Sequence, residues 1–328
     1  MTQQYAAQQP HGFVNQIRTV AIVGAGGQVG KFFTKHLLKT RKHVVTAITR
    51  SGGNSTFPDG VKTAPVDYDD EPSLVAALKG HDFLIITLSL AAAPDTHSKL
   101  VTAASKAGVP YVMPNAHSIN FHDSERLRKD IPIGDTVLER IAEVKRLGMT
   151  CIVLMVGFWY EFSLAAGENT FDFCMDSRKV MFYDDGKKRV NTSTWEQCGR
   201  AVAALLELKR LPDDQGDNSV TISRFQDRPL FVSSFTVSQL DVLESVKRVT
   251  RTTDDEWKVT YQPATERYEE GMEELRQGNQ MGFYKAMFAR VFYASGDADF
   301  EPDNKLLGLP EEDIDEATCR AIEMAKAE

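Results

Sequence analysis

The 328-residue sequence has no long hydrophobic run, and this absence limits its relation to membranes. Its longest apolar stretch, residues 83–93, is shorter than the roughly 20 apolar residues that a membrane helix requires, and it contains Thr87 and Ser89. Residues 1–18 are rich in glutamine and lack the apolar core of a secretory signal, so we expect them to form a flexible tail. We therefore expect a soluble, cytoplasmic protein that has no contact with a membrane.

Paired cysteines and an excess of positive charge are also missing. The four cysteines are far apart and form no CxxC pair, which predicts reduced thiols and no metal site: Cys151, Cys174, Cys198 and Cys319. Lys and Arg number 38 against 46 Asp and Glu, so the net charge is −8. An acidic chain lacks the long-range attraction to phosphate that supplies most nonspecific affinity for nucleic acids. We therefore expect a small molecule rather than a nucleic acid as the partner, and a homodimer stays open.

Short apolar runs alternate with helical patterns in the first half of the sequence. Strands are expected at residues 19–23, 44–49, 61–66, 83–88, 109–113 and 150–156, and helices at residues 31–39, 74–79, 96–107 and 135–147. Such alternation predicts βαβ units and a parallel sheet. Apolar runs without polar alternation are typical of strands that are covered on both faces. The expected fold class is therefore α/β, with residues 19–157 forming a Rossmann-type, doubly wound parallel sheet.

The pattern changes in the second half. A short strand at residues 179–183 leads into a turn at residues 184–186. Capping boxes, in which a Thr is followed three residues later by a Gln, predict helix starts at Thr194 and Thr236. Further helices are expected at residues 266–277, 281–292 and 311–325. We expect residues 158–328 to form a smaller, mainly helical substrate-binding region that is interleaved with the sheet edge.

The strongest chemical signal is a glycine-rich turn, Gly24 to Gly30, between the first strand and the first helix. Its sequence GAGGQVG does not fit GxGxxG, because Val29 occupies the sixth position, but it fits GxxGxxG through Gly24, Gly27 and Gly30. Glycine permits the tight turn, the approach of the backbone to a pyrophosphate and close packing of helix against strand. The helix N-terminus then offers unpaired N–H groups to the phosphates. The turn, with Gln28 and Val29, therefore predicts a dinucleotide site.

Residues at the ends of the next strands indicate which dinucleotide binds. NAD-preferring sites usually carry an acidic residue about 20 positions after the glycines, at the end of the second strand. Arg50 stands there instead, and its planar guanidinium can pair with the 2′-phosphate of NADP. The predicted cofactor is therefore NADP(H). We expect Asp67 and Tyr68 near the adenine, and Leu88 and Ser89 beside a cofactor ribose.

The glycine turn, Arg50 and residues 66–70 and 109–115 together resemble the NmrA-like, isoflavone-reductase-like atypical short-chain dehydrogenases. The resemblance is closest to a fungal branch labelled CipA-like oxidoreductases, to which further segments are similar: residues 157–164, 185–195, 232–239 and 307–310. It implies a Rossmann-type domain that binds NADP(H) beneath a variable substrate pocket. It also implies reduction of C=C, C=N or benzylic ether bonds in small plant or fungal metabolites. A minority of the family are redox-sensing regulators without turnover.

Two places depart from the family pattern. After Asn115, which we place at the cofactor, the sequence continues AHSIN where the reductases usually have Glu and an aromatic-Gly turn. The active-site lysine that these reductases tend to carry corresponds to Val137 by an ungapped count from Gly148. The Tyr-x-x-x-Lys pair of ordinary short-chain dehydrogenases is absent too. The usual proton donor is therefore missing, which sets this sequence apart in mechanism but not in cofactor binding.

A substitute acid or base is expected near the carboxyl ends of the strands, where ligands bind in open α/β sheets. His117 follows the fifth strand, and His titrates near neutral pH. Tyr160 and Glu161 follow the sixth strand, on the opposite wall of the expected pocket. We therefore predict these three as catalytic candidates. The alternatives are a hydrogen-bonded structural role for His117 and simple packing for Tyr160.

Aromatic residues indicate an apolar substrate. Phe158 and Trp159 are expected to form an apolar wall against the nicotinamide or an aromatic substrate, and His122 to contact the substrate. A later stripe with helical spacing is more often typical of a core than of a pocket: Phe283, Tyr284, Met287, Phe288 and Phe292. If some of these residues line the site, the substrate is large and apolar.

Three functions are compatible with these features, and the first is favoured. It is an NADP(H)-dependent oxidoreductase that tailors a small, largely apolar fungal secondary metabolite, an alkaloid or aromatic compound, by C=N or C=C reduction. The second is a redox-coupled or redox-neutral cyclase or isomerase on the same scaffold, which the missing lysine favours. The third is a non-catalytic NADP redox sensor that binds a regulator.

Overall fold

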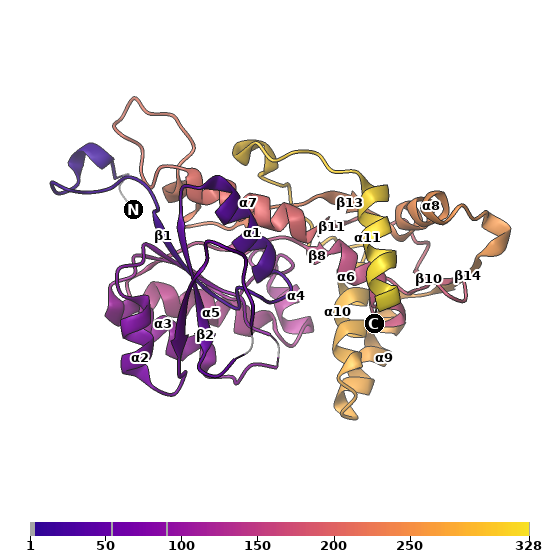
Figure 1. The fold of residues 1–328 in the computed structure, drawn as a ribbon. Helices are drawn as coiled ribbons and strands as arrows, with labels where there is room; N and C mark the ends of the chain where they lie inside the picture. The colour runs from indigo at the N-terminus through magenta and orange to yellow at the C-terminus, as the bar shows by residue number, and fades with distance from the viewer. Residues whose placement is uncertain (1–3, 54, 90, 328) are drawn as a thin grey trace.

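The structure is a computed structural model that describes residues 4–53, 55–89 and 91–327 (Figure 1). Its main sheet has six parallel strands in the order β3-β2-β1-β4-β5-β6. The strands are β1 (Thr19–Val23), β2 (Val44–Arg50), β3 (Lys62–Val66), β4 (Phe83–Ile86), β5 (Tyr111–Met113) and β6 (Thr150–Cys151). The strand order reverses between β1 and β4, and sheets of this kind bind ligands at the carboxyl ends beside that reversal. The predicted doubly wound α/β sheet is confirmed.

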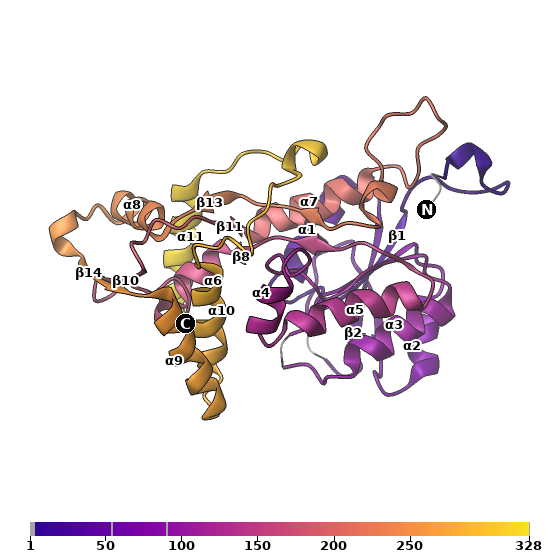
Figure 2. The same ribbon diagram turned by 180° about the vertical axis from the view of Figure 1, so that it is seen from behind.

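Helices cover both faces of this sheet (Figures 1 and 2). One face carries α1 (Gly30–Thr40) and α7 (Trp195–Glu207), and the other carries α2 (Glu71–Leu78), α3 (Thr96–Ala107) and α5 (Gly134–Arg146). Successive strand residues serve opposite faces. In β1, Val20 and Ile22 pack toward α1 and α7, whereas Ala21 and Val23 pack toward the other three helices. The inner strands β1 and β4 are buried on both faces, so the centre of the sheet is a rigid base for a ligand at its carboxyl edge.

The second half of the chain adds small sheets as well as helices. The sheets are β14 (Lys258–Gln262) with β10 (Lys179–Tyr183) and β9 (Phe173–Cys174), β13 (Phe235–Val237) with β11 (Val190–Ser193) and β8 (Phe158–Trp159), and β12 (Leu230–Phe231) with β7 (Leu154–Met155). The helices are α6 (Tyr160–Ala165), α8 (Gln239–Thr250), α9 (Ala264–Arg276), α10 (Met281–Val291) and α11 (Ile314–Ala327). This region is mainly helical, as predicted, but it contains more short strands than the one expected at residues 179–183.

Shorter helical segments complete the fold. They are α4 (Glu125–Asp130) and the 3-10 helices η1 (Ala6–Gln8), η2 (Gly167–Asn169), η3 (Ile222–Phe225), η4 (Asp254–Glu256) and η5 (Asn304–Leu307). Among the helices in the described part of the chain, none has both the length and the apolar character needed to cross a membrane.

Two local predictions are wrong. The strand expected at residues 150–156 is split, because Ile152 still pairs with β5 whereas the Val153 carbonyl oxygen accepts a hydrogen bond from the Leu230 N–H at 2.8 Å. The chain thus changes its partner strand midway. The second capping box begins at Ser238, whose hydroxyl accepts from the Asp241 N–H at 3.1 Å. Thr236 lies in β13 instead.

The N-terminal segment is docked rather than free, apart from residues 1–3, which lie outside the described residues. The Ala6 N–H donates to the Pro212 carbonyl oxygen at 2.8 Å. The Arg210 guanidinium donates to the Val14 carbonyl oxygen at 3.2 Å and lies 4.7 Å from the centre of the Phe13 ring. The prediction of a flexible tail is therefore wrong for Ala6, Phe13 and Val14, because a loop about 200 positions later in the chain holds them.

Candidate functional site

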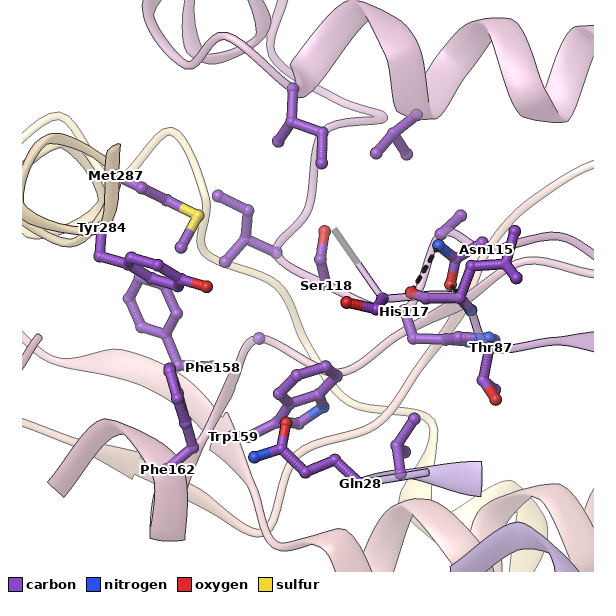
Figure 3. Close-up of a pocket in the computed structure, with 18 of the residues that line it drawn as sticks. Gln28, Thr87, Asn115, His117, Ser118, Phe158, Trp159, Phe162, Tyr284 and Met287 are labelled. Atoms are coloured by element: carbon purple, nitrogen blue, oxygen red, sulfur yellow. Dashed lines mark hydrogen bonds between the residues drawn. The ribbon is translucent and has the colours of Figure 1, made fainter. Parts of the chain in front are cut away.

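A cavity of about 470 Å³ lies at the carboxyl edge of the main sheet, where β1, β4 and β5 end (Figure 3). The glycine turn and the loops after β4 and β5 form one side of it. Helix α5 forms a second side, and the start of α6 together with α10 forms a third. The two halves of the chain therefore share the cavity.

Two glycines fix the glycine turn against the neighbouring strand. Gly24 has a φ of +77°, and a Cβ there would lie 2.0 Å from the Thr87 carbonyl oxygen. At Gly30 a Cβ would lie 2.1 Å from the Gly24 carbonyl oxygen. No side chain caps the N-terminus of α1, and residues 27–29 line the cavity at that end. The turn thus presents open N–H groups and the positive end of a helix dipole, which suit a pyrophosphate.

Arg50 ends β2, the strand beside β1, and Asp67 and Tyr68 follow β3; none of the three is part of the cavity lining. Arg50 pairs in register with Val66, and its side chain is exposed. Burial raises the pKa of the half-buried Tyr68, and the nearby Arg50 charge opposes that rise. Asp67 accepts a hydrogen bond from the Asp69 N–H at 2.9 Å. Their contacts with a cofactor stay predictions.

Asn115 ties together the loops that follow β4 and β5. Its Oδ1 accepts a hydrogen bond from the Leu88 N–H and its Nδ2 donates to the Leu88 carbonyl oxygen, both at 3.1 Å. Both residues and the adjacent Ser89 line the cavity. The structure therefore brings these three predicted cofactor residues together on one wall, with the backbone of the two loops fixed.

Arg140, which sequence reasoning missed, is the one Lys or Arg among the described residues that line the cavity. Its Nη1 donates to the Asn115 carbonyl oxygen at 3.0 Å. Burial lowers the pKa of its guanidinium, although Arg stays charged in proteins. It follows Val137 on the same face of α5, because side chains three positions apart on a helix are neighbours. The three-residue spacing from Val137 is the sequence feature that could have identified Arg140 as a cavity residue.

His117 lines the cavity but is held as a structural residue. Its Nε2 lies 3.0 Å from the Ile86 carbonyl oxygen and must carry the proton that it donates. Its ring packs edge-on against Phe33, with 5.4 Å between the ring centres. Burial lowers the pKa of the imidazole to about 4, so His117 is neutral at neutral pH. This arrangement argues against the predicted acid role and agrees with the structural alternative.

Tyr160 and Glu161 point away from the cavity. Tyr160 is fully buried, and its hydroxyl lies 2.7 Å from the Thr318 hydroxyl in α11. Burial raises the pKa of Tyr160. Glu161 is buried as well and accepts a hydrogen bond from the Arg320 guanidinium at 3.2 Å. The prediction that both face the substrate is wrong, because β8 ends at Trp159 and the start of α6 turns the next two side chains toward α11.

The two predicted substrate contacts differ in position. His122 is exposed, with 2.9 Å between its Nδ1 and the Asp123 carboxylate, and it is not part of the cavity lining, so this prediction is wrong. Trp159 does line the cavity. Phe158 lines it too and stacks on Phe288 with 3.9 Å between the ring centres. The apolar wall is therefore present, while its contact with nicotinamide or substrate stays a prediction.

Helix α10 forms the far wall of the cavity. It does so with the aromatic stripe that we expected, from its helical spacing, to belong to a core. Four members of the stripe line the cavity: Phe283, Tyr284, Met287 and Phe288. The fifth, Phe292, packs against Tyr183 with 5.1 Å between the ring centres. Figure 3 shows the Tyr284 ring and the Met287 side chain facing the space between Ser118 and Trp159. Helical period alone cannot separate a face that lines a cavity from a face that fills a core.

A doubly wound parallel sheet, with a glycine turn at the strand reversal and a cavity beside it, defines a Rossmann-type protein with a small-molecule pocket. More narrowly, the NmrA-like family model matches residues 16–162. This matched part of the chain, which carries the glycine turn and the first wall of the cavity, is similar to the NmrA-like family. The resemblance inferred from the sequence is thereby confirmed.

Proteins similar to most of the chain include an oxidoreductase and two reductases. Over 314 residues the chain is 28% identical to the oxidoreductase aprR of Aspergillus flavus, a match that covers 92% of this chain and 98% of the relative. A crystal structure of an isoflavone reductase matches with a TM-score of 0.70 at 16% identity, over 92% of this chain and 99% of that one. The Citrobacter triphenylmethane reductase, complexed with NADP(H), matches with a TM-score of 0.64 at 20% identity and the same coverage. These solved structures share the fold of this chain.

Proposed function

We propose that this protein is an NADP(H)-dependent oxidoreductase that reduces a small, largely apolar aromatic molecule. The observation that carries the proposal is the cavity of about 470 Å³, in which the glycine turn and an aromatic wall face the same space. A nicotinamide and an aromatic acceptor could meet there, and such close placement is what hydride transfer requires. The relative named as an oxidoreductase and the similar reductase complexed with NADP(H) support the same class.

The cofactor side of the proposal rests on three features of this chain. The open N-terminus of α1 and residues 27–29 would hold the pyrophosphate. The exposed Arg50, at the end of β2, would pair with the 2′-phosphate. Asn115 and Leu88 would present a fixed wall to the nicotinamide end. When bound, NADPH supplies the hydride.

The described acceptor side of the cavity carries no charged side chain. The cavity wall from α6 and α10 is aromatic and apolar, and the described lining contains no carboxylate. Apolar walls bind a flat apolar ring by burying its surface, and they keep water away from the transferred hydride. We therefore propose an aromatic compound with a reducible C=N or C=C bond as the substrate class, as found in alkaloids and other fungal secondary metabolites.

The test combines purified protein and NADPH with an aromatic imine (dihydroisoquinoline), a quinone (menadione) and a triphenylmethane dye (malachite green). The absorbance of reduced nicotinamide and the product mass are followed together. We expect reduced product in amounts that match the NADPH consumed for at least one acceptor. Tight NADPH binding with no product from any acceptor would contradict the enzyme and favour the redox-sensor alternative.

A redox-neutral cyclase or isomerase is the second candidate, and Val137 favours it. This apolar side chain lines the cavity. By the ungapped count from Gly148 we match it to the active-site lysine of the related reductases. The nearby Arg140 stays protonated and cannot take over proton donation. In this alternative the cofactor is recycled or only completes the pocket. A substrate that is converted with no net change in NADPH would support it.

A further inference from the structure

The Tyr284 hydroxyl is a polar group in the cavity that the protein leaves without a partner. It points from α10 into the cavity (Figure 3), and none of the described residues makes a hydrogen bond with it. Its ring is held between Phe162 and Phe283, at 5.9 and 5.4 Å between ring centres. The ring is therefore fixed by packing while its hydroxyl remains available to a ligand.

The helix that carries Tyr284 is itself firmly placed. A Cβ at Gly282 would lie 2.4 Å from the Gly271 carbonyl oxygen, so the backbones of α10 and α9 are in direct contact. The Arg290 side chain in α10 donates to the Asp130 carboxylate at 2.6 Å. The Tyr268 hydroxyl in α9 donates to the Asp130 carbonyl oxygen at 2.7 Å. Since Asp130 ends α4, these bonds fix the helical hairpin to the sheet half.

Other donors in the cavity wall are poor sources of a proton. His117 is neutral, and its one N–H is committed to a backbone oxygen. Arg140 does not give up a proton in proteins, and the indole N–H of Trp159 does not ionise. Ser118 offers only an aliphatic hydroxyl. A phenolic O–H gives up its proton more readily than an aliphatic O–H, and Tyr284 carries the one phenol among the described lining residues.

We propose that Tyr284 donates a hydrogen bond to the imine nitrogen or carbonyl oxygen of the acceptor and protonates it during reduction. This proposal rests on the oxidoreductase function proposed above. The hydride would leave a C–H bond of NADPH, which is thereby oxidised to NADP⁺, and would form a C–H bond at the acceptor carbon as the C=N or C=O π bond breaks. The tyrosine O–H bond breaks, and its proton forms an N–H or O–H bond at the heteroatom. Water then returns a proton to the tyrosinate. Within the proposed substrate class this role favours aromatic imines over C=C compounds, and it extends the class to aromatic carbonyl compounds.

The test compares two acceptors of nearly equal size, at a mildly alkaline pH that leaves the imine unprotonated. Dihydroisoquinoline needs a proton, whereas N-methyl-dihydroisoquinolinium carries a permanent charge and needs none. Tyr284→Phe keeps the ring contacts and removes only the hydroxyl. We expect it to lower the ratio of the imine rate to the iminium rate by at least about tenfold. An unchanged ratio overturns the proposal even if both rates fall, because packing alone would then explain the loss.

Tyr261→Phe is the matched control. Tyr261 is 65% exposed on β14, and its hydroxyl lies outside the cavity lining. Removing that hydroxyl should leave the rate ratio at the wild-type value.

Binding measurements distinguish a failure of this proposal from a failure of the oxidoreductase function on which it rests. Calorimetry on the NADP⁺-loaded protein should show that Tyr284→Phe weakens dihydroisoquinoline binding about fivefold, the effect of one lost hydrogen bond. Dihydronaphthalene, which lacks the nitrogen, should bind both proteins equally. If wild-type protein oxidises NADPH with none of the acceptors named above, the oxidoreductase function fails, while the binding difference still decides whether the Tyr284 hydroxyl binds the acceptor nitrogen. Equal weakening of both ligands, or of neither, overturns that role.

Discussion

The two halves of the molecule build the cavity by different means. The sheet half uses backbone: a glycine turn pressed against β4, an open helix N-terminus, and loops that Asn115 locks together. The second half uses side chains from segments that are far apart in sequence, such as Trp159 and Tyr284. The cofactor side is therefore specified by local conformation, whereas the acceptor side is specified by tertiary packing.

This difference indicates which substitutions each half of the cavity can tolerate. The backbone site has no spare volume at Gly24 and Gly30, where an added methyl group would overlap main-chain atoms. A wall of side chains can exchange one aromatic for another while the helices behind it stay in place. We expect changes on the cofactor side to abolish binding, and changes on the acceptor side to alter which molecule reacts.

The largest effect is expected from Gly24→Ala. The new Cβ would overlap the Thr87 carbonyl oxygen, so β1 and β4 must shift where the turn meets the cofactor. We expect NADPH affinity, measured by fluorescence titration, to fall by about a hundredfold or more. Gly26→Ala is the matched control, because its Cβ would only touch the Phe57 ring at 3.4 Å. Equal NADPH affinity in both variants would refute a backbone-built site.

An intermediate effect is expected on the free energy of unfolding, which His117 makes dependent on pH. Its pKa is about 4 in the folded protein against an ordinary 6.5, so the unfolded chain takes up the proton first as the pH falls. Stability is therefore lost between about pH 6.5 and 4, by up to about 3 kcal/mol. His117→Asn should flatten this part of the curve of unfolding free energy against pH. An imidazole that titrates near pH 6.5 by NMR in the folded protein would restore the predicted acid role.

A smaller and more selective effect is expected from Arg50→Ala. The guanidinium is exposed, so the fold should be unaffected, but NADPH loses the partner of its 2′-phosphate. We expect NADPH affinity to fall about tenfold with NADH affinity unchanged. Lys62→Ala, an exposed cation on the adjacent β3, is the control for a general loss of charge. A parallel fall for both cofactors would contradict the assigned role.

Local patterns predicted the elements of the fold well. The helix Thr96–Ala107 and the strand Lys179–Tyr183 match their predicted bounds, because apolar spacing and turn residues act within a few positions. The docked N-terminal segment could not be foreseen, since its partners, Arg210 among them, lie in a distant loop. The split of the last sheet strand also depends on a distant partner, Leu230.

The site was predictable to the extent that backbone builds it. Strand–turn–helix context places residues 27–29 at the cavity without knowledge of the rest of the chain. The direction of Tyr160 depends on where β8 ends, a single-residue boundary that sequence patterns do not resolve. The role of Tyr284 depends on which side of α10 meets the other half of the protein, and its helical period is the same in either case.

The measurement that tests most directly whether cofactor and acceptor meet in one cavity is the fate of labelled hydrogen. NADPH that carries deuterium at both positions of its hydride-donating carbon is incubated with the protein and dihydroisoquinoline, and the product is analysed by mass spectrometry. We predict tetrahydroisoquinoline with one carbon-bound deuterium in each product molecule. Product without deuterium, or NADPH oxidation without product, would contradict a shared cavity for hydride transfer.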